Sequence, residues 1–173
     1  MTIKAYPRGS GDYISPHFRA SEFDCKCGKC KTTYFDVDLV RYVLVPTRSL
    51  LNVPGHVNSG YRCAEHNKKV GGSYSSLHTG KGAVDITFET DDHKKVAATF
   101  EKLGAGGIGW YPDQSFVHVD GREKKFFWRG HEQHQMQSFI DPEVKPDEKM
   151  IDAIATLATK NYNALMKLLN EYR

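Results

Sequence analysis

The sequence predicts an α+β fold in which helices flank a small antiparallel sheet. Residues 83–89, AVDITFE, alternate between apolar and polar side chains, which is the pattern of a half-buried strand. Residues 106–111 and 116–121, GGIGWY and FVHVDG, read as two more strands joined by PDQS, and therefore predict a hairpin. Residues 91–104, DDHKKVAATFEKLG, instead carry apolar side chains at the spacing of an amphipathic helix.

The first third of the chain predicts one helix and little else that is regular. Residues 1–16 are rich in Gly, Pro and Ser and predict an arm or loop, and residues 15–23 predict a turn followed by a helix start. Residues 36–52 have apolar side chains at helical spacing, with Asp36 as the N-cap. Pro46 lies inside this helix and must kink or split it, because proline has no N–H to donate.

The middle of the chain holds shorter elements. Residues 55–62, GHVNSGYR, predict a short strand and a loop, and residues 64–72 predict a helical turn ended by two glycines. The helix over 91–104 should begin at Asp91 or Asp92, which cap well, and end at Gly104.

The composition changes after Gly130. Residues 131–148 are polar and contain prolines, as a linker does, whereas residues 149–173 again place apolar side chains at helical spacing. We therefore predict one domain over 1–130, followed over 131–173 by a linker and a helical C-terminal extension. The extension is expected to pack on the first domain.

Composition limits the classes of protein to consider. The chain has 173 residues, 39% of them hydrophobic and 26% charged, which suits one domain with its own core. The net charge of +3 is too small to indicate nucleic acid, although it suits a polyanionic surface. No apolar run approaches the ~20 residues that span a membrane, and the N-terminus lacks the apolar core of a secretory signal. We expect a monomer made in the cytoplasm.

Three residues near the predicted strands have the chemistry of a metal site. His78 lies in the glycine-containing loop SLHTGKGAVDI, Asp85 follows on the strand, and His118 lies on the second strand of the hairpin. Two imidazoles and a carboxylate form a ligand set that zinc uses in catalytic sites, with the fourth place left to water. The alternative is that each residue is a surface group or a paired polar core group, because His-x6-Asp alone is a weak signal.

A family resemblance favours the metal site. Several separated motifs occur in the order found in the zinc D-alanyl-D-alanine carboxypeptidase family of peptidoglycan peptidases, and the chain resembles that family over about residues 16–128. The matching motifs are Ser59-Gly60-Tyr61-Arg62, then Ser76, His78 and Asp85 in Ser-x-His-x6-Asp, and His118 and Asp120 in His-x-Asp. The resemblance implies an α+β fold shared with the hedgehog signalling domain and lysostaphin-type enzymes. It also implies that His78, Asp85 and His118 bind one catalytic Zn²⁺.

Other residues near these motifs are candidates for binding substrate. Arg62 can hold an oxyanion or a terminal carboxylate with its planar fork, or can form a structural salt bridge. Ser76 is a candidate for hydrogen bonding to substrate, or for capping its own loop. Trp110, and Tyr111 beside it, are candidates for the wall of a substrate groove, or for the core.

The sequence leaves the general base open. Many relatives place a Glu or His a few residues before the last zinc histidine, but here Ser115 takes the place of the Glu in Glu-x-x-His. Asp120 shares a strand face with His118 and is a candidate base, or a carboxylate that orients the ligand. Asp113, five positions before His118, is the reserve candidate.

Four cysteines form a separate motif. Cys25, Cys27 and Cys30 lie in CKCGKC, and Cys63 follows Arg62. They predict a second, structural zinc, to which His66 could contribute, or disulfides if the protein works outside a reducing compartment, or free thiols.

We read the chain as a zinc metallopeptidase that hydrolyses a peptide bond involving D-amino acids in bacterial peptidoglycan. The bond is the terminal D-alanyl-D-alanine bond or an internal L-alanyl-D-glutamate bond. Small size and the absence of a signal fit a phage lysis enzyme that reaches the wall through a pore made by another protein, although a bacterial wall-remodelling enzyme is an alternative. In that reading the C-terminal helices could also bind wall polymer or a second copy. The rival is a non-catalytic, zinc-containing binding module of hedgehog-like fold, which the missing Glu-x-x-His favours.

Overall fold

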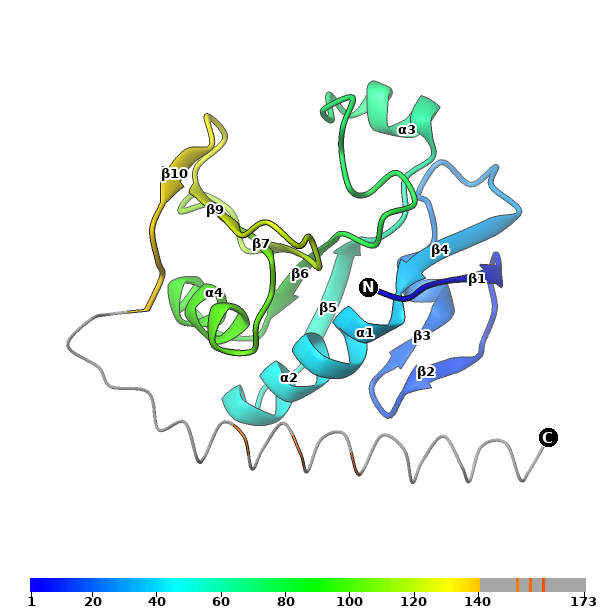
Figure 1. Ribbon diagram of the computed structural model, residues 1–173. Coiled ribbons are helices and arrows are strands. Elements are labelled where there is room, and N and C mark those ends of the chain that lie inside the picture. The colour runs from blue at the N-terminus through cyan, green and yellow to red at the C-terminus, as the bar shows by residue number, and fades with distance from the viewer. Residues whose placement is uncertain (141–151, 153–155, 157–159, 161–173) are drawn as a thin grey trace.

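A computed structural model describes residues 1–140 together with the single residues Asp152, Thr156 and Lys160. It confirms the α+β class: the described chain contains a central sheet, two small two-stranded sheets and several helices (Figure 1). The strands are β1 (Ile3–Pro7), β2 (Tyr13–Ser15), β3 (Phe18–Arg19), β4 (Thr32–Asp36), β5 (Gly55–Ser59), β6 (Val84–Phe88), β7 (Gly107–Trp110), β8 (Val117–Asp120), β9 (Phe126–Arg129) and β10 (His134–Met136). The helical segments are η1 (Ala20–Phe23), α1 (Val37–Leu39), η2 (Val40–Leu44), α2 (Val45–Leu51), α3 (Ala64–Lys69) and α4 (His93–Lys102).

The central sheet has six strands in the order β10-β9-β7-β8-β6-β5. Its neighbours are antiparallel except β7 and β9, which are parallel. The predicted hairpin is present as β7 and β8. The register aligns one residue from each of five strands in a row across the sheet: Ser59, Asp85, His118, Gly109 and Trp128.

The two faces of the central sheet have different roles. Val84 and Ile86 of β6 point to one face and join a hydrophobic core that includes Val96 and Phe100 of α4. Because side chains alternate along a strand, Asp85 of β6 and the His118 and Asp120 side chains of β8 lie on the opposite face. The apolar face therefore holds the sheet against the helices, and the other face is available for chemistry.

The helices predicted over 36–52, 64–72 and 91–104 are present, with one irregularity. Asp36 caps α1, accepting a hydrogen bond from the Asp38 backbone N–H at 3.1 Å. The chain stays helical to Leu51 but is divided by the wide turn η2, and Pro46 takes one of the first positions of α2. Proline is tolerated there because it has no N–H to satisfy, and a widened turn accommodates the loss. Helix α4 is capped by Asp92 and followed by Gly104, as expected.

Both ends of the described chain contain strands that the sequence analysis did not predict. The arm over residues 1–16 contributes β1, which pairs with β4, and β2, which pairs with β3. Residues 131–140, assigned above to a linker, contribute β10 to the central sheet, and Phe139 is buried against Phe127. A strand of polar residues at a sheet edge has no apolar alternation to reveal it, and the domain boundary at residue 130 stays a prediction. The predicted C-terminal helices lie outside the described residues, apart from the three single residues.

Within the described part of the chain, no helix combines the length and the apolarity that crossing a membrane requires.

Candidate metal centre

The metal candidates come together because of strand register and one glycine-containing loop. Asp85 on β6 and His118 on β8 are directly paired in the sheet. His78 lies in the loop before β6, and this loop turns back on itself through Gly80 and Gly82, whose φ angles are +88° and +83°. Such angles favour glycine, and a side chain at Gly82 would also overlap Asp36. The loop thereby places His78 above the paired strands.

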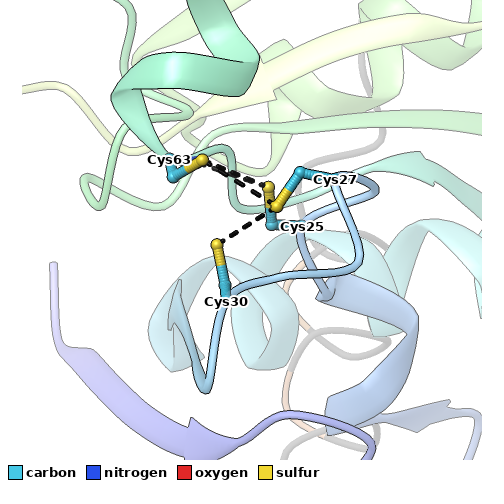
Figure 2. A group of neighbouring side chains, drawn as sticks. All are labelled: Cys25, Cys27, Cys30 and Cys63. Carbon is cyan, nitrogen blue, oxygen red and sulfur yellow. Dashed lines mark hydrogen bonds between the residues drawn. The ribbon is translucent and has the colours of Figure 1, made fainter.

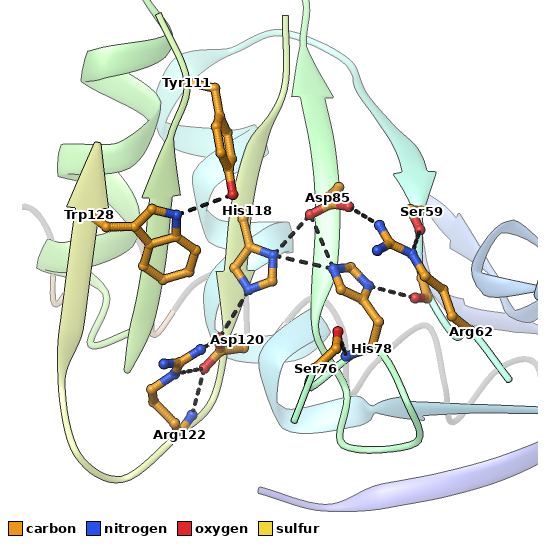
Figure 3. A network of polar contacts seen from close by, with 11 residues as sticks. Ser59, Arg62, Ser76, His78, Asp85, Tyr111, His118, Asp120, Arg122 and Trp128 are labelled. Atoms are coloured by element: carbon orange, nitrogen blue, oxygen red, sulfur yellow. Dashed lines mark hydrogen bonds and ion pairs between the residues drawn. The ribbon is translucent and has the colours of Figure 1, made fainter. Parts of the chain in front are cut away.

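The three side chains direct one atom each toward a common point (Figure 3). His78 Nε2 lies 3.2 Å from Asp85 Oδ1 and 3.2 Å from His118 Nδ1, and His118 Nδ1 lies 2.9 Å from Asp85 Oδ1. Ligands of a tetrahedral zinc ion at roughly 2.05 Å would be about 3.3 Å apart. All three residues are buried. The donor set and its spacing therefore fit Zn²⁺.

Each presumed ligand is held from behind by a second group. The outer nitrogen of His78, Nδ1, lies 2.8 Å from the carbonyl oxygen of Gly60 and donates to it. His118 Nε2 donates to Asp120 Oδ2 at 3.0 Å, and Arg62 Nη2 donates to Asp85 Oδ2 at 2.5 Å. Because the outer nitrogen of each imidazole acts as a donor, the nitrogen that faces the common point is the one that would give up its proton to bind a metal.

A cavity of about 540 Å³ opens over this group. His78, Asp85 and His118 form part of its wall, together with Arg62, Ser76, Tyr111, Phe116, Arg122, Trp128 and His131. The metal candidates are thus accessible from a space that could admit a peptide, rather than enclosed in the core. Such an arrangement is suited to catalysis, because a structural metal site is closed by protein ligands on every side.

Comparison with known proteins identifies the family of this site. A model of the Peptidase M15 family matches residues 16–120, more than half of the chain. The chain belongs to the Peptidase M15 family. This membership confirms the predicted resemblance to zinc peptidases of peptidoglycan.

Two curated relatives of this M15 peptidase carry related names. The probable peptidoglycan L,D-endopeptidase MepK of Haemophilus influenzae is 32% identical over 84 residues, 46% of this chain and 45% of that protein. The peptidoglycan L,D-endopeptidase MepK of Escherichia coli strain K12 is 32% identical over 72 residues, 39% of this chain and 40% of that protein. The chain spans less than half the length of either relative.

Arg62 and Ser76 lie beside the metal candidates of this M15 peptidase. Both line the cavity. Arg62 forms the salt bridge considered above, because its Nη2 contacts Asp85 Oδ2, and its Nε donates to Ser59 Oγ at 2.8 Å. Ser76 Oγ accepts a hydrogen bond from the His78 backbone N–H at 3.3 Å and so also caps the loop.

Asp120 lies behind His118 and has no exposed surface. Besides His118, its carboxylate accepts hydrogen bonds from the Arg122 backbone N–H, Nε and Nη2 at 3.0, 2.8 and 2.6 Å. Gly107 lies opposite on β7, and a side chain there would overlap Asp120 and Arg122. Asp120 is therefore placed to orient His118 and does not itself line the cavity, which makes it a poor general base.

Two candidates from the sequence do not line the cavity. Trp110 lies on the strand face opposite to Gly109 and packs beneath the guanidinium of Arg129, 5.2 Å from the ring centroid. Asp113 is exposed in the turn between β7 and β8, where its Oδ2 lies 3.3 Å from His131 Nε2. Trp110 thus points away from the sheet face that holds His118, and the turn carries Asp113 away from that face.

The sequence analysis missed Trp128, Arg122 and His131. The ring centroids of Trp128 and His118 lie 5.1 Å apart. The Trp128 ring passes over β7 at Gly109, where any side chain would overlap it. Its Nε1 donates to the Tyr111 hydroxyl at 3.1 Å. The aromatic run over 126–128 could have revealed β9, because aromatic side chains favour strands. His131 was read as part of the polar linker.

Neighbouring charged groups shift the pKa values of three buried residues in the site. Burial disfavours ionisation of Asp85, but hydrogen bonds from His118 and His78 outweigh burial and hold the pKa of Asp85 below its ordinary range. For Asp120, burial is likewise outweighed by His118 and Arg122, which lower its pKa. Burial lowers the pKa of His118, yet the carboxylates of Asp120 and Asp85 raise it to about 9. In the metal-free protein both ring nitrogens of His118 are therefore protonated at neutral pH, and a metal ion must displace the proton on Nδ1.

Proposed function

We propose that this M15 peptidase is a zinc-dependent endopeptidase that hydrolyses an internal L,D peptide bond in peptidoglycan stem peptides. The observation that carries the proposal is the convergence of His78 Nε2, Asp85 Oδ1 and His118 Nδ1 at the wall of an open cavity. The names of the curated relatives support the substrate class and the kind of bond. They favour the internal bond over the terminal D-alanyl-D-alanine bond, which joins two D-residues.

The residues that would hold the ion are His78, Asp85 and His118. When bound, zinc supplies Lewis acidity, which polarises the scissile carbonyl and lets water act as a nucleophile at neutral pH. The chain contributes the orientation of the ligands: Asp120 holds the His118 ring, and Arg62 holds the Asp85 carboxylate. These outer contacts keep the ligand geometry rigid while substrate enters.

Arg62 and Ser76 are proposed to bind substrate. The Arg62 side chain is 17% exposed and faces the cavity, so its guanidinium can stabilise negative charge on the carbonyl oxygen or bind a stem-peptide carboxylate. Ser76 can hydrogen-bond to the peptide from the same wall. Tyr111 and Trp128 form an aromatic wall opposite, against which a peptide can pack.

Proton transfer is proposed to use His131 with Asp113. His131 lines the cavity and is outside the metal candidates, and its ring packs against that of Tyr111 with centroids 5.0 Å apart. Asp113 faces His131 Nε2 and would stabilise the imidazolium that forms when His131 accepts a proton. Asp113, the reserve candidate for the general base, then acts through His131, which the sequence analysis assigned to the linker.

The experiment is digestion of purified peptidoglycan, with mass spectrometry of the released fragments. Wild-type protein should release fragments cut at an L,D bond, chelator should abolish release, and Zn²⁺ should restore it. His118→Ala should lose both the ion and the activity. Release of D-alanine alone would assign carboxypeptidase activity instead. Binding to peptidoglycan without any cleavage would establish the rival, a non-catalytic binding module.

We also propose that the setting is phage lysis, with the enzyme made in the host cytoplasm and brought to the wall through a pore made by another protein. The support is the net charge of +3, which suits a polyanionic wall. Expression in a bacterial host should leave cells intact, whereas co-expression with a pore-forming protein should lyse them. Lysis that is independent of the pore, or no lysis with it, would contradict this setting.

A further inference from the structure

The four cysteines meet at one point in the fold, although Cys63 is far from the other three in the sequence (Figure 2). Cys25, Cys27 and Cys30 lie in the loop between η1 and β4, and Cys63 directly precedes α3. One Sγ from each cysteine lies within 4.8 Å of every other. Cys25 is buried and the other three are half-buried. The cluster is separate from the cavity of the catalytic candidates, because none of the four lines that cavity.

The spacing of the sulfur atoms matches coordination of a single ion. Cys27 Sγ lies 3.4 Å from Cys30 Sγ, and Cys63 Sγ lies 3.9 Å from both Cys25 Sγ and Cys27 Sγ. Four sulfurs around tetrahedral zinc at roughly 2.3 Å are about 3.8 Å apart. A disulfide needs about 2.05 Å and pairs sulfurs two by two. Here Cys63 Sγ is equally far from two other sulfurs, whereas a disulfide would place it next to one of them.

Backbone N–H groups point at three of the four sulfurs. The N–H of Lys29 donates to Cys27 Sγ, that of Cys63 to Cys25 Sγ, and that of His66 to Cys63 Sγ, each at 3.4 Å. A neutral thiol is a weak acceptor, whereas a thiolate bound to a metal gains from such donors. His66 contributes its backbone N–H, and the group of side chains close enough to hold one ion consists of the four cysteines.

The loop is shaped to bring its three sulfurs to one side. Gly28 lies at its turn with a φ angle of +76°, and its N–H donates to the Cys25 carbonyl oxygen at 3.4 Å. Arg8 Nη1 donates to the same carbonyl oxygen at 2.7 Å and ties the loop to the N-terminal strand region. Lys26 and Lys29 lie within the motif, and no acidic residue lies between Cys25 and Cys30 to oppose the negative charge of thiolates.

We propose that Cys25, Cys27, Cys30 and Cys63 bind a second Zn²⁺ that has a structural role. Four thiolates fill the tetrahedral shell and leave no place for water or substrate, which is the arrangement of structural zinc sites. Binding converts each thiol to a thiolate, and the protons pass to solvent. The proposal decides among the three states that the sequence left open, and it does not depend on the proposed function.

The position of this site relates it to the catalytic residues. Cys63 follows Arg62, whose Nη2 contacts Asp85, and the ion would join this point to a loop 38 residues earlier. The backbone on the other side of Arg62 is held as well, since the Tyr61 N–H donates to the Phe23 carbonyl oxygen at 2.9 Å. Loss of the ion should therefore loosen the support of Arg62 and weaken catalysis indirectly.

The test is the metal content and spectroscopy of the purified full chain. Wild-type protein should hold two zinc ions per chain, and the double variant His78→Ala/His118→Ala should retain one. That variant, loaded with Co²⁺ alone, should show sulfur-to-cobalt charge-transfer bands, and X-ray absorption of its zinc form should show only sulfur at about 2.3 Å. The double variant Cys27→Ser/Cys30→Ser should lose these bands and retain the ion bound by the histidines.

Several results would overturn the proposal. One zinc per wild-type chain with no sulfur ligands would do so, as would a mass lower by four hydrogens, which indicates two disulfides. Four thiols that react readily with a thiol reagent in the folded, zinc-replete protein would also overturn it. Because the histidine variant leaves the cysteines intact, the result does not require that the cysteine variants fold. Activity without thiolate bands would reject this site while leaving the proposed function standing.

Discussion

Replacing Asp120 by asparagine tests how the candidate metal centre is built. Asp120 Oδ2 accepts from His118 Nε2 and Arg122 Nη2, and its Oδ1 accepts from the backbone N–H and Nε of Arg122. Asparagine keeps the shape but replaces one oxygen by an NH₂ group. In either orientation this group faces two donors, so two of the four hydrogen bonds are lost.

The size of the effect follows from these contacts. Asp120 is fully buried, and a hydrogen bond to a charged group contributes roughly 1.5–3 kcal/mol. Arg122 is 30% exposed and can turn to water, so we expect Asp120→Asn to lower the free energy of unfolding by about 3 kcal/mol. Removing the carboxylate behind a metal-binding histidine should weaken zinc affinity by roughly 10- to 100-fold. That factor corresponds to about 1.4–2.8 kcal/mol.

The assay measures zinc affinity by competition with a chromogenic chelator, and then kcat at saturating zinc. We expect weaker affinity in Asp120→Asn, with kcat restored to near the wild-type value once zinc is bound. Glu89→Gln is the matched control, because Glu89 faces His56 Nε2 at 2.7 Å in an exposed pair outside the site. Unchanged zinc affinity combined with a kcat lower by roughly 100-fold would refute the reasoning, since it would make Asp120 the general base.

Three further predictions concern neighbouring groups. His131→Ala should lower kcat by roughly 100-fold at unchanged zinc content, whereas His134→Ala, which changes an exposed histidine outside the cavity wall, should not; equal activities would exclude His131 as the base. Arg62→Lys should lower kcat/KM by roughly tenfold at full zinc content, because an ammonium cannot reproduce the planar guanidinium that bridges two acceptors; wild-type kinetics would contradict this role. Because the pKa of His118 is raised from 6.5 to about 9, protonated His118 stabilises the metal-free fold fully below pH 6.5, and this stabilisation is lost as the pH rises to about 9. Relative to metal-free His118→Gln, the wild type should thus lose about 3 kcal/mol over that range in urea denaturation, and a constant difference would argue against the charged pair.

The local signals in the sequence were strong where side chains alternate or cap. The alternation over 83–89 indicated β6, and Asp36 and Asp92 marked the starts of helices that the structure contains. Such features depend on neighbours within a few residues, so they can be read without the fold. The order of the M15 motifs in the sequence likewise marked His78, Asp85 and His118 as candidates.

Other features depended on pairing between distant segments. Strand β10 is polar and becomes a strand only because β9 offers its edge. Trp128 reaches His118 because β9 pairs in parallel with β7 and the Trp128 ring passes over Gly109. No local pattern encodes this pairing. Asp113 and Trp110 were near the right motifs, yet neither lines the cavity, because Asp113 lies in the turn after β7 and Trp110 points to the opposite face of the sheet.

By itself, the sequence determined the fold class, the family and the types of residue that could bind metal, because each is a matter of residue type and spacing. Only the tertiary structure decided which of those residues share a point in space. Register across β6 and β8 pairs Asp85 with His118, and the packing of one loop beside α3 brings Cys63 to three cysteines earlier in the chain. The physical reason is that a metal site is a distance condition among side chains, and long-range backbone pairing sets those distances.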